Sequence, residues 1–557
     1  MHSADSGPIC TTRLAAFGGT RGNGLGFIAV DVENQDTAAH TVSVQMENRL
    51  WTGHDVSAER TVVLAPNERM RFFLPRPNTA MGNCGVVARV DAQPLRTALN
   101  VGRIDGPLGL LVTDRSDLQP WGALAMSAIP TASSDAPTVQ AARTELLPAD
   151  WRLYTAFDTV LVDGRATIGA EIQEALRRFV FSGGVVVIGG AERLPAGSLR
   201  DIVARTSGVA TRHGLGFVVD VPFDTGDTTV LRDRLAALPR STMSGWPAPD
   251  TLGNEQPIPG VGRAPKTMFL TVILLFAVLV GPVNFVLLRR WKRPLLVLAT
   301  VPALGIGTTV AMLGLAFVRD GLGVRGVVVS WTWIDQQRHE GTAVAARTLF
   351  CGLSPSAFAL SPDSMVFSPR ATGATSRGGR DRWELDAANG LLDGGALPSR
   401  QPTPLLASQQ GTVRQRLRVR AAGDTLEVLA DGGVTPVGDV VLCDLDGVVW
   451  AGAAPTLRRA TEQLATGSVD AWGRAAGTFD VVEPEHERWR IPAGADDTTV
   501  VSLQAMLARF VDGDLPRGTY LAVVKEAPWL DEHGVRVEYD RSRHFVAGRL
   551  AAEDFVR

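Results

Sequence analysis

The stretch that decides the fold is Met268–Val318, which reads MFLTVILLFAVLVGPVNFVLL, then RRWKRP, then LLVLATVPALGIGTTVAMLGLAFV. Two apolar runs of 21 and 24 residues, neither holding a charged residue, enclose a basic break. About 20 apolar residues in a helix cross the hydrocarbon core of a bilayer. A buried helical hairpin of a soluble protein is disfavoured, because core helices seldom stay apolar on every face for this length. We predict a transmembrane helical hairpin over residues 267–319, between two large soluble halves.

A hairpin returns the chain to the side it came from, so both soluble halves must share one compartment. Lys and Arg in short loops stay cytoplasmic, and the turn between the runs carries four of them: Arg289, Arg290, Lys292 and Arg293. We predict two spans in a bacterial inner (cytoplasmic) membrane, with both large domains periplasmic or extracellular. Met1–Ala15 shows no signal peptide. Either an upstream signal was removed or the topology is inverted, and we favour the first.

Small residues recur every four positions on both apolar runs, a spacing that lets helix backbones approach closely. With a polar amide and a proline near the turn, the residues expected in helix packing are Ala277, Gly281, Pro282, Asn284, Ala303, Gly307 and Ala311. Packing within the hairpin explains them better than a surface for a partner helix. Neither run holds an acidic residue or a histidine, so the chain is not expected to be a transporter or pump on its own.

The four cysteines divide evenly between the soluble halves of this 557-residue chain: Cys10 and Cys84 before the hairpin, Cys351 and Cys443 after it. This division suits one disulfide in each half, and disulfides persist in oxidising compartments. The alternative is four unrelated buried thiols. No CxxC or HxxxH pair indicates a zinc site. The net charge of −3 gives no support for nucleic-acid binding.

The soluble half before the hairpin contains two patterns. Residues 1–104 hold short segments that alternate apolar and polar residues between turns, which predicts an immunoglobulin-like β-sandwich. In residues 105–240, continuous apolar strands alternate with an amphipathic helix at Ile168–Gly184, which predicts a flavodoxin-like α/β domain with a parallel sheet. Residues 241–266 are rich in Pro and Gly and indicate a linker.

The α/β region carries a resemblance to a known family. Its motifs are LPADW (Leu147–Trp151), a helix ending in GG, VVVIGG (Val185–Gly190), HGLGFVVDVPFD (His213–Asp224) and, in the hairpin, GPVNFVLLRR (Gly281–Arg290). In this order they resemble an uncharacterised bacterial two-span envelope family. That family combines a β-sandwich, a class I glutamine-amidotransferase-like domain, a GPxN-containing hairpin and a C-terminal β domain.

The resemblance implies a nucleophilic cysteine on the turn after the strand at Val185–Ile188. Here that turn reads Gly189-Gly190-Ala191-Glu192, with no Cys, Ser or Thr to attack an acyl group. We expect the fold without the chemistry, as a binding or scaffolding module. The carboxyl ends of the strands remain the default place for a ligand.

Residues 320–557 predict mainly β structure, with one motif that has two interpretations. VLCDLDGVVWAG (Val441–Gly452) resembles the first motif of haloacid-dehalogenase-type phosphatases, in which Asp444 would be the nucleophile, Asp446 the acid/base and Mg²⁺ the cofactor. The alternative is a β-hairpin with Asp446 and Gly447 in its turn. We favour the hairpin because no later acidic motif follows an apolar strand. A further acidic group could bind a metal, although a solvated loop is favoured: Glu483, Glu485, His486 and Glu487.

The sequence therefore predicts a multidomain membrane protein: a β-sandwich, an α/β domain, a transmembrane hairpin and a mainly-β C-terminal domain. We expect no enzymatic activity and no cofactor. The expected role is a scaffold, binding or accessory subunit of a membrane complex, such as a transporter. Its partners would be the lipid bilayer and other membrane or envelope proteins. The alternatives are an envelope hydrolase using the α/β cleft, a phosphatase using Asp444 and Asp446, and a sensor binding a small ligand in that cleft.

Overall fold

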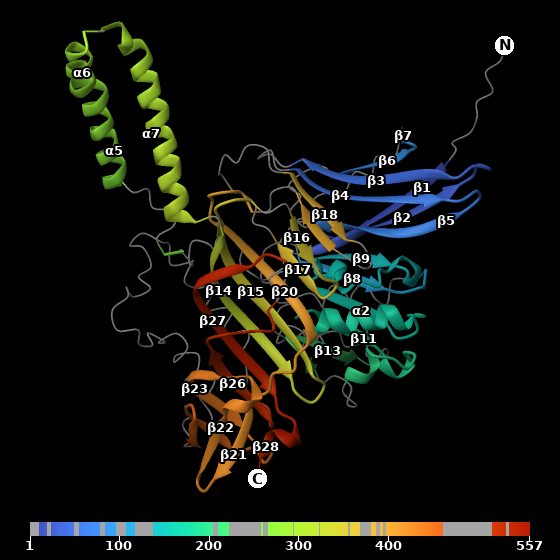
Figure 1. Cartoon of the computed structure of the whole chain (residues 1–557). Coiled ribbons are helices and arrows are strands. Elements are labelled where there is room, and N and C mark those ends of the chain that lie inside the picture. Colours follow the sequence, from blue (N-terminus) through green and yellow to red (C-terminus); the bar gives the residue numbers. More distant parts are fainter. Residues whose placement is uncertain are drawn as a thin grey trace, which may run out of the picture.

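The computed structural model of the chain is rich in β-strands and has few helices among the residues that it describes (Figure 1). These residues are 10–18, 24–49, 55–77, 84–95, 107–116, 137–203, 210–221, 258–259, 266–292, 294–321, 323–354, 357–367, 380–385, 390–393, 397–460, 515–530 and 534–556. They form four sheets, of three, six, seven and twelve strands.

Two sheets built mainly from the N-terminal strands pack face to face as a sandwich. One has the order β1-β2-β5, and the other includes β4-β3-β6-β7. Alternating strand residues fill the core between them, among them Ile28, Val30, Val44 and Val86. The strands are β1 (Cys10–Phe17), β2 (Leu25–Asn34), β3 (His40–Arg49), β4 (Asp55–Leu64), β5 (Arg69–Pro77), β6 (Cys84–Val90) and β7 (Gln93–Leu95).

The six-stranded sheet has the order β12-β13-β11-β10-β8-β9, and all its pairs are parallel except β12 with β13. Strands β8, β10 and β11 are buried along their whole length, which is why they read as unbroken apolar runs. Helix α2 buries Leu176, Phe179 and Val180 and is followed by Gly183 at φ 118°. The elements are β8 (Leu108–Val112), β9 (Thr138–Ala142), η1 (Thr144–Leu146), η2 (Trp151–Tyr154), β10 (Thr159–Asp163), α2 (Ala170–Phe181), β11 (Val185–Gly189), η3 (Ala191–Arg193), η4 (Arg200–Ile202), β12 (Ala210–His213) and β13 (Gly216–Val221).

The twelve-stranded sheet has the order β17-β20-β15-β14-β27-β26-β23-β24-β25-β22-β21-β28. Strand β14 is the fourth strand in this order and pairs with β15 and β27 along its whole length. The elements are β14 (Val324–Asp335), β15 (Glu340–Cys351), β17 (Ser364–Phe367), β20 (Thr403–Thr412), β21 (Arg418–Ala422), β22 (Thr425–Leu429), η7 (Ala430–Gly432), β23 (Pro436–Cys443), β24 (Val449–Ala453), β25 (Thr456–Arg459), β26 (Thr519–Val524), β27 (Val537–Arg549), η8 (Ala552–Asp554) and β28 (Phe555–Val556).

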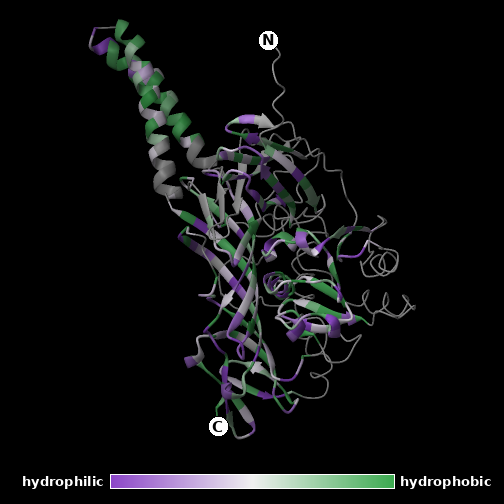
Figure 2. Cartoon of the chain, turned by 90° about the vertical axis from the view of Figure 1, so that its right-hand side faces the viewer, coloured by the Kyte–Doolittle hydropathy of each residue, from purple (hydrophilic) through white to green (hydrophobic). Residues whose placement is uncertain are grey.

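Two apolar helical segments extend away from the sheets as an antiparallel pair (Figures 1 and 2). Leu270–Arg290 is long and apolar enough to cross a membrane, whereas the apolar helix at Val297–Met312 is too short to meet the same length criterion. By length and composition, one span rather than the predicted two is therefore found among the described residues. The elements are α5 (Lys266–Val278), the π-helical turn η5 (Leu279–Val283), α6 (Asn284–Arg290), η6 (Pro294–Leu296) and α7 (Val297–Asp320).

The two halves of the chain, which the helices separate in sequence, share one sheet. Strand β18 (Arg380–Leu385) follows the helices and pairs in parallel with β4 of the N-terminal sandwich. Strands β19 (Gly390–Asp393) and β16 (Ala357–Leu360) extend the sheet, giving the order β16-β19-β18-β4-β3-β6-β7. Strands predicted to belong to separate domains, before and after the helices, therefore lie in one sheet.

Candidate functional site

The carboxyl ends of the parallel strands, the default ligand position, carry carboxylates that are bound within the fold. Asp163 ends β10 and is 1% exposed. Its carboxylate accepts hydrogen bonds from the Thr113 hydroxyl at 3.1 Å and the Arg165 amide at 3.0 Å. Asp114 follows β8 and accepts from the amide and hydroxyl of Thr144, at 3.0 and 2.7 Å. Burial raises the pKa of Asp114, but these hydrogen bonds outweigh burial and hold it below its usual value.

The turn after β11 has a conformation suited to glycine, and its residues Gly189 to Glu192 include no Cys, Ser or Thr. Gly190 adopts φ 80°, and a Cβ there would lie 3.1 Å from Glu192 Oε1. A Cβ on Gly164 would meet the Gly190 carbonyl oxygen at 2.1 Å, so the two turns are in close contact. The Ala191 amide donates to Asp220 Oδ1 at 2.8 Å. The turn is therefore a rigid structural corner.

Arg177 on α2 links the six-stranded sheet to the twelve-stranded sheet. Its guanidinium donates to Glu174 at 2.8 Å and to Glu340 of β15 at 3.0 Å. The same guanidinium lies 3.3 Å from His213 Nε2. Burial, reinforced by Arg177, lowers the pKa of His213 to about 3, so this ring is neutral and its Nε2 accepts the hydrogen bond.

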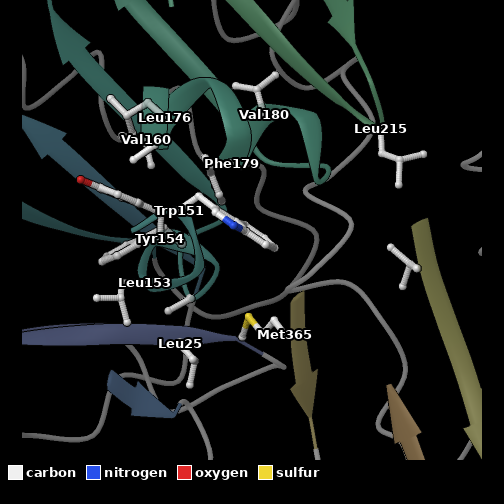
Figure 3. Packing of buried hydrophobic residues seen from close by; sticks show 14 of the residues in the cluster. Leu25, Trp151, Leu153, Tyr154, Val160, Leu176, Phe179, Val180, Leu215 and Met365 are labelled. Carbon is white, nitrogen blue, oxygen red and sulfur yellow. The ribbon is translucent and has the colours of Figure 1, made fainter. Parts of the chain in front are cut away.

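A second set of contacts between these sheets comes from the LPADW motif. The Trp151 indole donates to the Pro362 carbonyl at 3.2 Å, and Arg152 donates to the Ser361 carbonyl at 3.3 Å. Figure 3 shows Trp151 beside Tyr154 and Phe179, with Met365 of β17 below them. The motif therefore joins the region of the six-stranded sheet to the chain that follows the helices, a role that the sequence did not reveal.

The Asp444 motif forms a β-hairpin. Strands β23 and β24 are antiparallel neighbours, and Asp444 to Val448 form the turn between them. Asp444 Oδ1 accepts from the amides of Asp446 at 3.0 Å and Val448 at 2.8 Å, and Oδ2 accepts from the Trp450 indole at 2.8 Å. A phosphatase nucleophile would instead follow a strand of a parallel sheet. The carboxylate of Asp444 is used to hold the turn, as the hairpin interpretation predicted.

A buried serine and histidine lie side by side on two adjacent interior strands of the twelve-stranded sheet. Ser330 of β14 and His544 of β27 are register partners, and the Ser330 hydroxyl lies 2.7 Å from His544 Nδ1. Burial, with the nearby positive charge of Arg347, lowers the pKa of His544 to about 4. Ser330 and His544 are 0% and 4% exposed, so a substrate would not reach them. Sequence analysis missed this pair, since it depends on the register of two distant strands.

Among the described side chains, neither predicted disulfide is formed, and the side chain of Cys84 lies outside them. Cys10, Cys351 and Cys443 are free and buried, and burial raises the pKa of each thiol. Cys351 pairs with Val324 at one end of β14, while Cys443 pairs through β26 and β27 with the other end. Eleven strand steps of about 3.3 Å separate those ends, far beyond the roughly 6 Å between Cα atoms of a disulfide. For these three thiols, the alternative of separate buried cysteines is correct.

The helix pair does not pack on the predicted small residues. Ala277, Gly281, Ala303, Gly307 and Ala311 are exposed, and a Cβ added at either glycine would meet nothing within 4 Å. The less exposed stripe on α7 lies one residue further along: Thr300, Leu304, Thr308 and Met312.

Near the turn of the helix pair, three of the four predicted basic residues are described, and all three are exposed: Arg289, Arg290 and Lys292. Arg293 lies outside the described residues. Pro282 lies within the π-helical turn, two residues before the buried Asn284, whose Nδ2 has no hydrogen-bond partner.

The predicted acidic cluster Glu483–Glu487 lies outside the described residues. Within the part of the chain that the structure describes, no group of three His, Cys, Asp or Glu residues could hold a metal ion.

Comparison with known proteins gives no functional assignment. No protein-family model matches the chain, and no curated protein matches it. Among solved structures, one match is a Paenibacillus cycloisomaltooligosaccharide glucanotransferase complexed with cycloisomaltoheptaose. It is 16% identical, covers 27% of this chain and 19% of that chain, and has a TM-score of 0.13. A likeness at that level carries no argument about fold or activity.

Proposed function

We propose that this chain is a non-enzymatic, membrane-anchored envelope protein whose soluble halves fold together as one scaffold on one side of the bilayer. The observation that carries the proposal is the pairing of β18 with β4, which joins the chain after the helices to the chain before them. The Arg177–Glu340 ion pair and the Trp151–Pro362 hydrogen bond support the same union.

This union bears on the number of spans. If Leu270–Arg290 crosses the bilayer, the chain must cross again before β14, because residues in one sheet lie in one compartment. The returning segment would be α7, whose 24 residues give a helix about 36 Å long. Its apolar sequence continues to Val318. Two spans therefore reconcile the exposed apolar helices with the shared sheet.

Charge sets the proposed orientation. Arg289, Arg290 and Lys292 are exposed at the turn, away from the body, and basic residues in short loops stay cytoplasmic. The body would then lie on the periplasmic or extracellular side of a bacterial inner membrane.

A binding role is favoured over catalysis because the candidate polar groups form contacts within the fold. The α/β module resembles a class I amidotransferase domain, yet glycine occupies its elbow. Its helix α2 contributes Arg177 and Arg178 to contacts with Glu340 and Asp363 of the C-terminal half. Asp444, the proposed nucleophile of the phosphatase alternative, is bound within its own turn. The partners would be other membrane or envelope proteins, such as the subunits of a transporter.

Excision of the helices tests the proposal. Replacing residues 266–320 with a flexible Gly/Ser linker should release a folded, soluble body, since the chain before and after the helices meets the same end of the sheet. Ile258 packs there against Val327 and Phe350, and Val324 begins β14 there. The full chain should stay in carbonate-washed membranes.

Two measurements on these proteins decide the outcome. Limited proteolysis should give the same protected fragments for both, and crosslinking in membranes should join the full chain to other membrane proteins. An excised chain that remains in the membrane fraction would contradict the anchor. A full chain that crosslinks to nothing at native abundance would contradict the scaffold role.

A further inference from the structure

The path of the chain identifies the end of the twelve-stranded sheet that lies nearest the helices. Helix α7 ends at Asp320, and β14 begins at Val324, so their Cα atoms lie within about 15 Å of each other. On the other side of the helices, Ile258 is 4% exposed and packs against Val327 of β14 and Phe350 of β15. Both connections to the helix pair are therefore held at the same end of β14 and β15 (Figure 1).

The turn that leaves β15 lies at this end. The Gly352 amide donates to the Gly323 carbonyl at 3.2 Å, which brings the turn beside the chain leaving α7. The next residue, Leu353, is 56% exposed. Among the described residues outside the segment 266–320, only Val63 is a more exposed large hydrophobic side chain.

Hydrogen bonds hold this turn on both sides of Leu353. The Arg400 amide donates to the Cys351 carbonyl at 2.8 Å, and the Ser399 hydroxyl donates to the Gly352 carbonyl at 2.6 Å. The Ser354 hydroxyl donates to the Leu397 carbonyl at 2.7 Å. The backbone is therefore ordered while the Leu353 side chain projects into solvent. Contact with an apolar phase would bury this side chain without a further cost of ordering the turn.

We propose that Leu353, presented by the turn Cys351–Ser354, inserts into the interfacial region of the lipid bilayer. This inference rests on the proposed membrane anchor and adds a third contact with the membrane beyond the two helices. Contact of Leu353 with the membrane would fix the tilt of the body relative to the bilayer, because β14 is continuous from this end to Asp335, about 36 Å away. The strands of the body would then stand on the membrane through the β15 turn.

A matched control lies at the opposite end of the same sheet. Leu445 is 45% exposed in the turn between β23 and β24. That turn follows Cys443, which aligns through Thr519 and Arg549 with Asp335. Leu445 therefore has the same residue type as Leu353 and a comparable exposure but lies far from the helices. Phe285, 65% exposed on α6, serves as the positive control for lipid contact.

The test is fluorescence quenching in proteoliposomes of phosphatidylcholine and phosphatidylglycerol. Leu353→Cys, Leu445→Cys and Phe285→Cys are each labelled with an environment-sensitive fluorophore under native conditions. The unsubstituted chain serves as the labelling blank, since three of its cysteines are buried. Brominated acyl chains quench only probes that contact the apolar phase. We expect a comparable loss of fluorescence at positions 353 and 285, and no loss at 445.

The controls separate the two possible failures. Quenching at 285 with none at 353 would overturn this proposal and leave the membrane anchor standing. Equal quenching at 353 and 445 would also overturn it, because the body would then lack a defined membrane-facing end. No quenching at 285 would overturn the anchor, and with it the lipid contact of Leu353.

Discussion

Removing the Asp444 carboxylate separates its structural role from a catalytic one. In the structure this carboxylate accepts three hydrogen bonds, two from backbone amides and one from the Trp450 indole. A hydrogen bond to a charged group contributes roughly 1.5–3 kcal/mol, and the lower end applies at this partly buried site. Because the three bonds form one turn, their contributions do not add fully. We expect Asp444→Ala to destabilise the β23–β24 hairpin by about 3 kcal/mol.

The assay is amide hydrogen exchange of the detergent-solubilised chain. A loss of about 3 kcal/mol corresponds to roughly 100-fold faster exchange at the amides of the turn, since 1.4 kcal/mol is a factor of ten. Asp446→Ala is the matched control, because that side chain is exposed. It should change local stability by less than about 0.5 kcal/mol.

The refuting result combines stability and activity. If the unsubstituted chain hydrolyses a phosphate monoester with Mg²⁺, and both variants abolish hydrolysis without changing exchange at the turn, then the carboxylates are catalytic. The reasoning from the hydrogen bonds would then be wrong, and the scaffold role with it.

Substitutions at a glycine turn, a buried histidine and an ion pair test the packing of the body. Gly190→Ala should destabilise the α/β module by about 1 kcal/mol, because residue 190 has a φ of 80°. Gly169→Ala is the control and should be neutral or slightly stabilising, because a Cβ there meets nothing within 4 Å. Proteolytic protection of the module measures the effect of both substitutions. His544 has a folded pKa of about 4, below its usual 6.5, so the stability that it contributes is present above pH 6.5 and is lost as pH falls toward 4. Thermal unfolding should show a loss of about 1.5 kcal/mol between pH 6.5 and 5, and His544→Gln, whose amide can still form a hydrogen bond with Ser330, should reduce that loss. Arg177→Gln should cost about 1–2 kcal/mol and speed proteolysis between the α/β module and the twelve-stranded sheet, and an unchanged cleavage rate would count against that contact.

The parts of the fold that could be predicted from sequence have local patterns. Strands β8, β10 and β11 are unbroken apolar runs because parallel strands are buried on both faces. Helix α2 shows the stripe of a helix that covers a sheet. The apolar helices stand out by length and composition alone.

What sequence reasoning missed depends on register and on distance along the chain. The pairing of β18 with β4 joins segments more than 300 residues apart, and no local pattern marks it. Ser330 and His544 meet because two strands 214 residues apart align in one register. Register also explains the wrong disulfide prediction, since it places Cys351 and Cys443 at opposite ends of the sheet.

The predicted packing residues of the helices differ from the less exposed ones for a similar reason. Small residues at Ala303 and Gly307 indicate where close packing is sterically allowed, not where it occurs. The less exposed stripe includes Leu304 and Thr308, one residue further along and so rotated by about 100°.

Site-specific labelling of three exposed positions tests the central claim most directly. Val63 on β4 is 64% exposed, Leu445 is 45% exposed, and Trp291 in the basic turn is 57% exposed. Each is replaced by cysteine in turn and probed in intact cells with a membrane-impermeant maleimide. We predict labelling of Val63→Cys and Leu445→Cys before permeabilisation, and of Trp291→Cys only after it. Labelling of the first two from opposite sides, or of all three from one side, would contradict a single body anchored by a two-span hairpin.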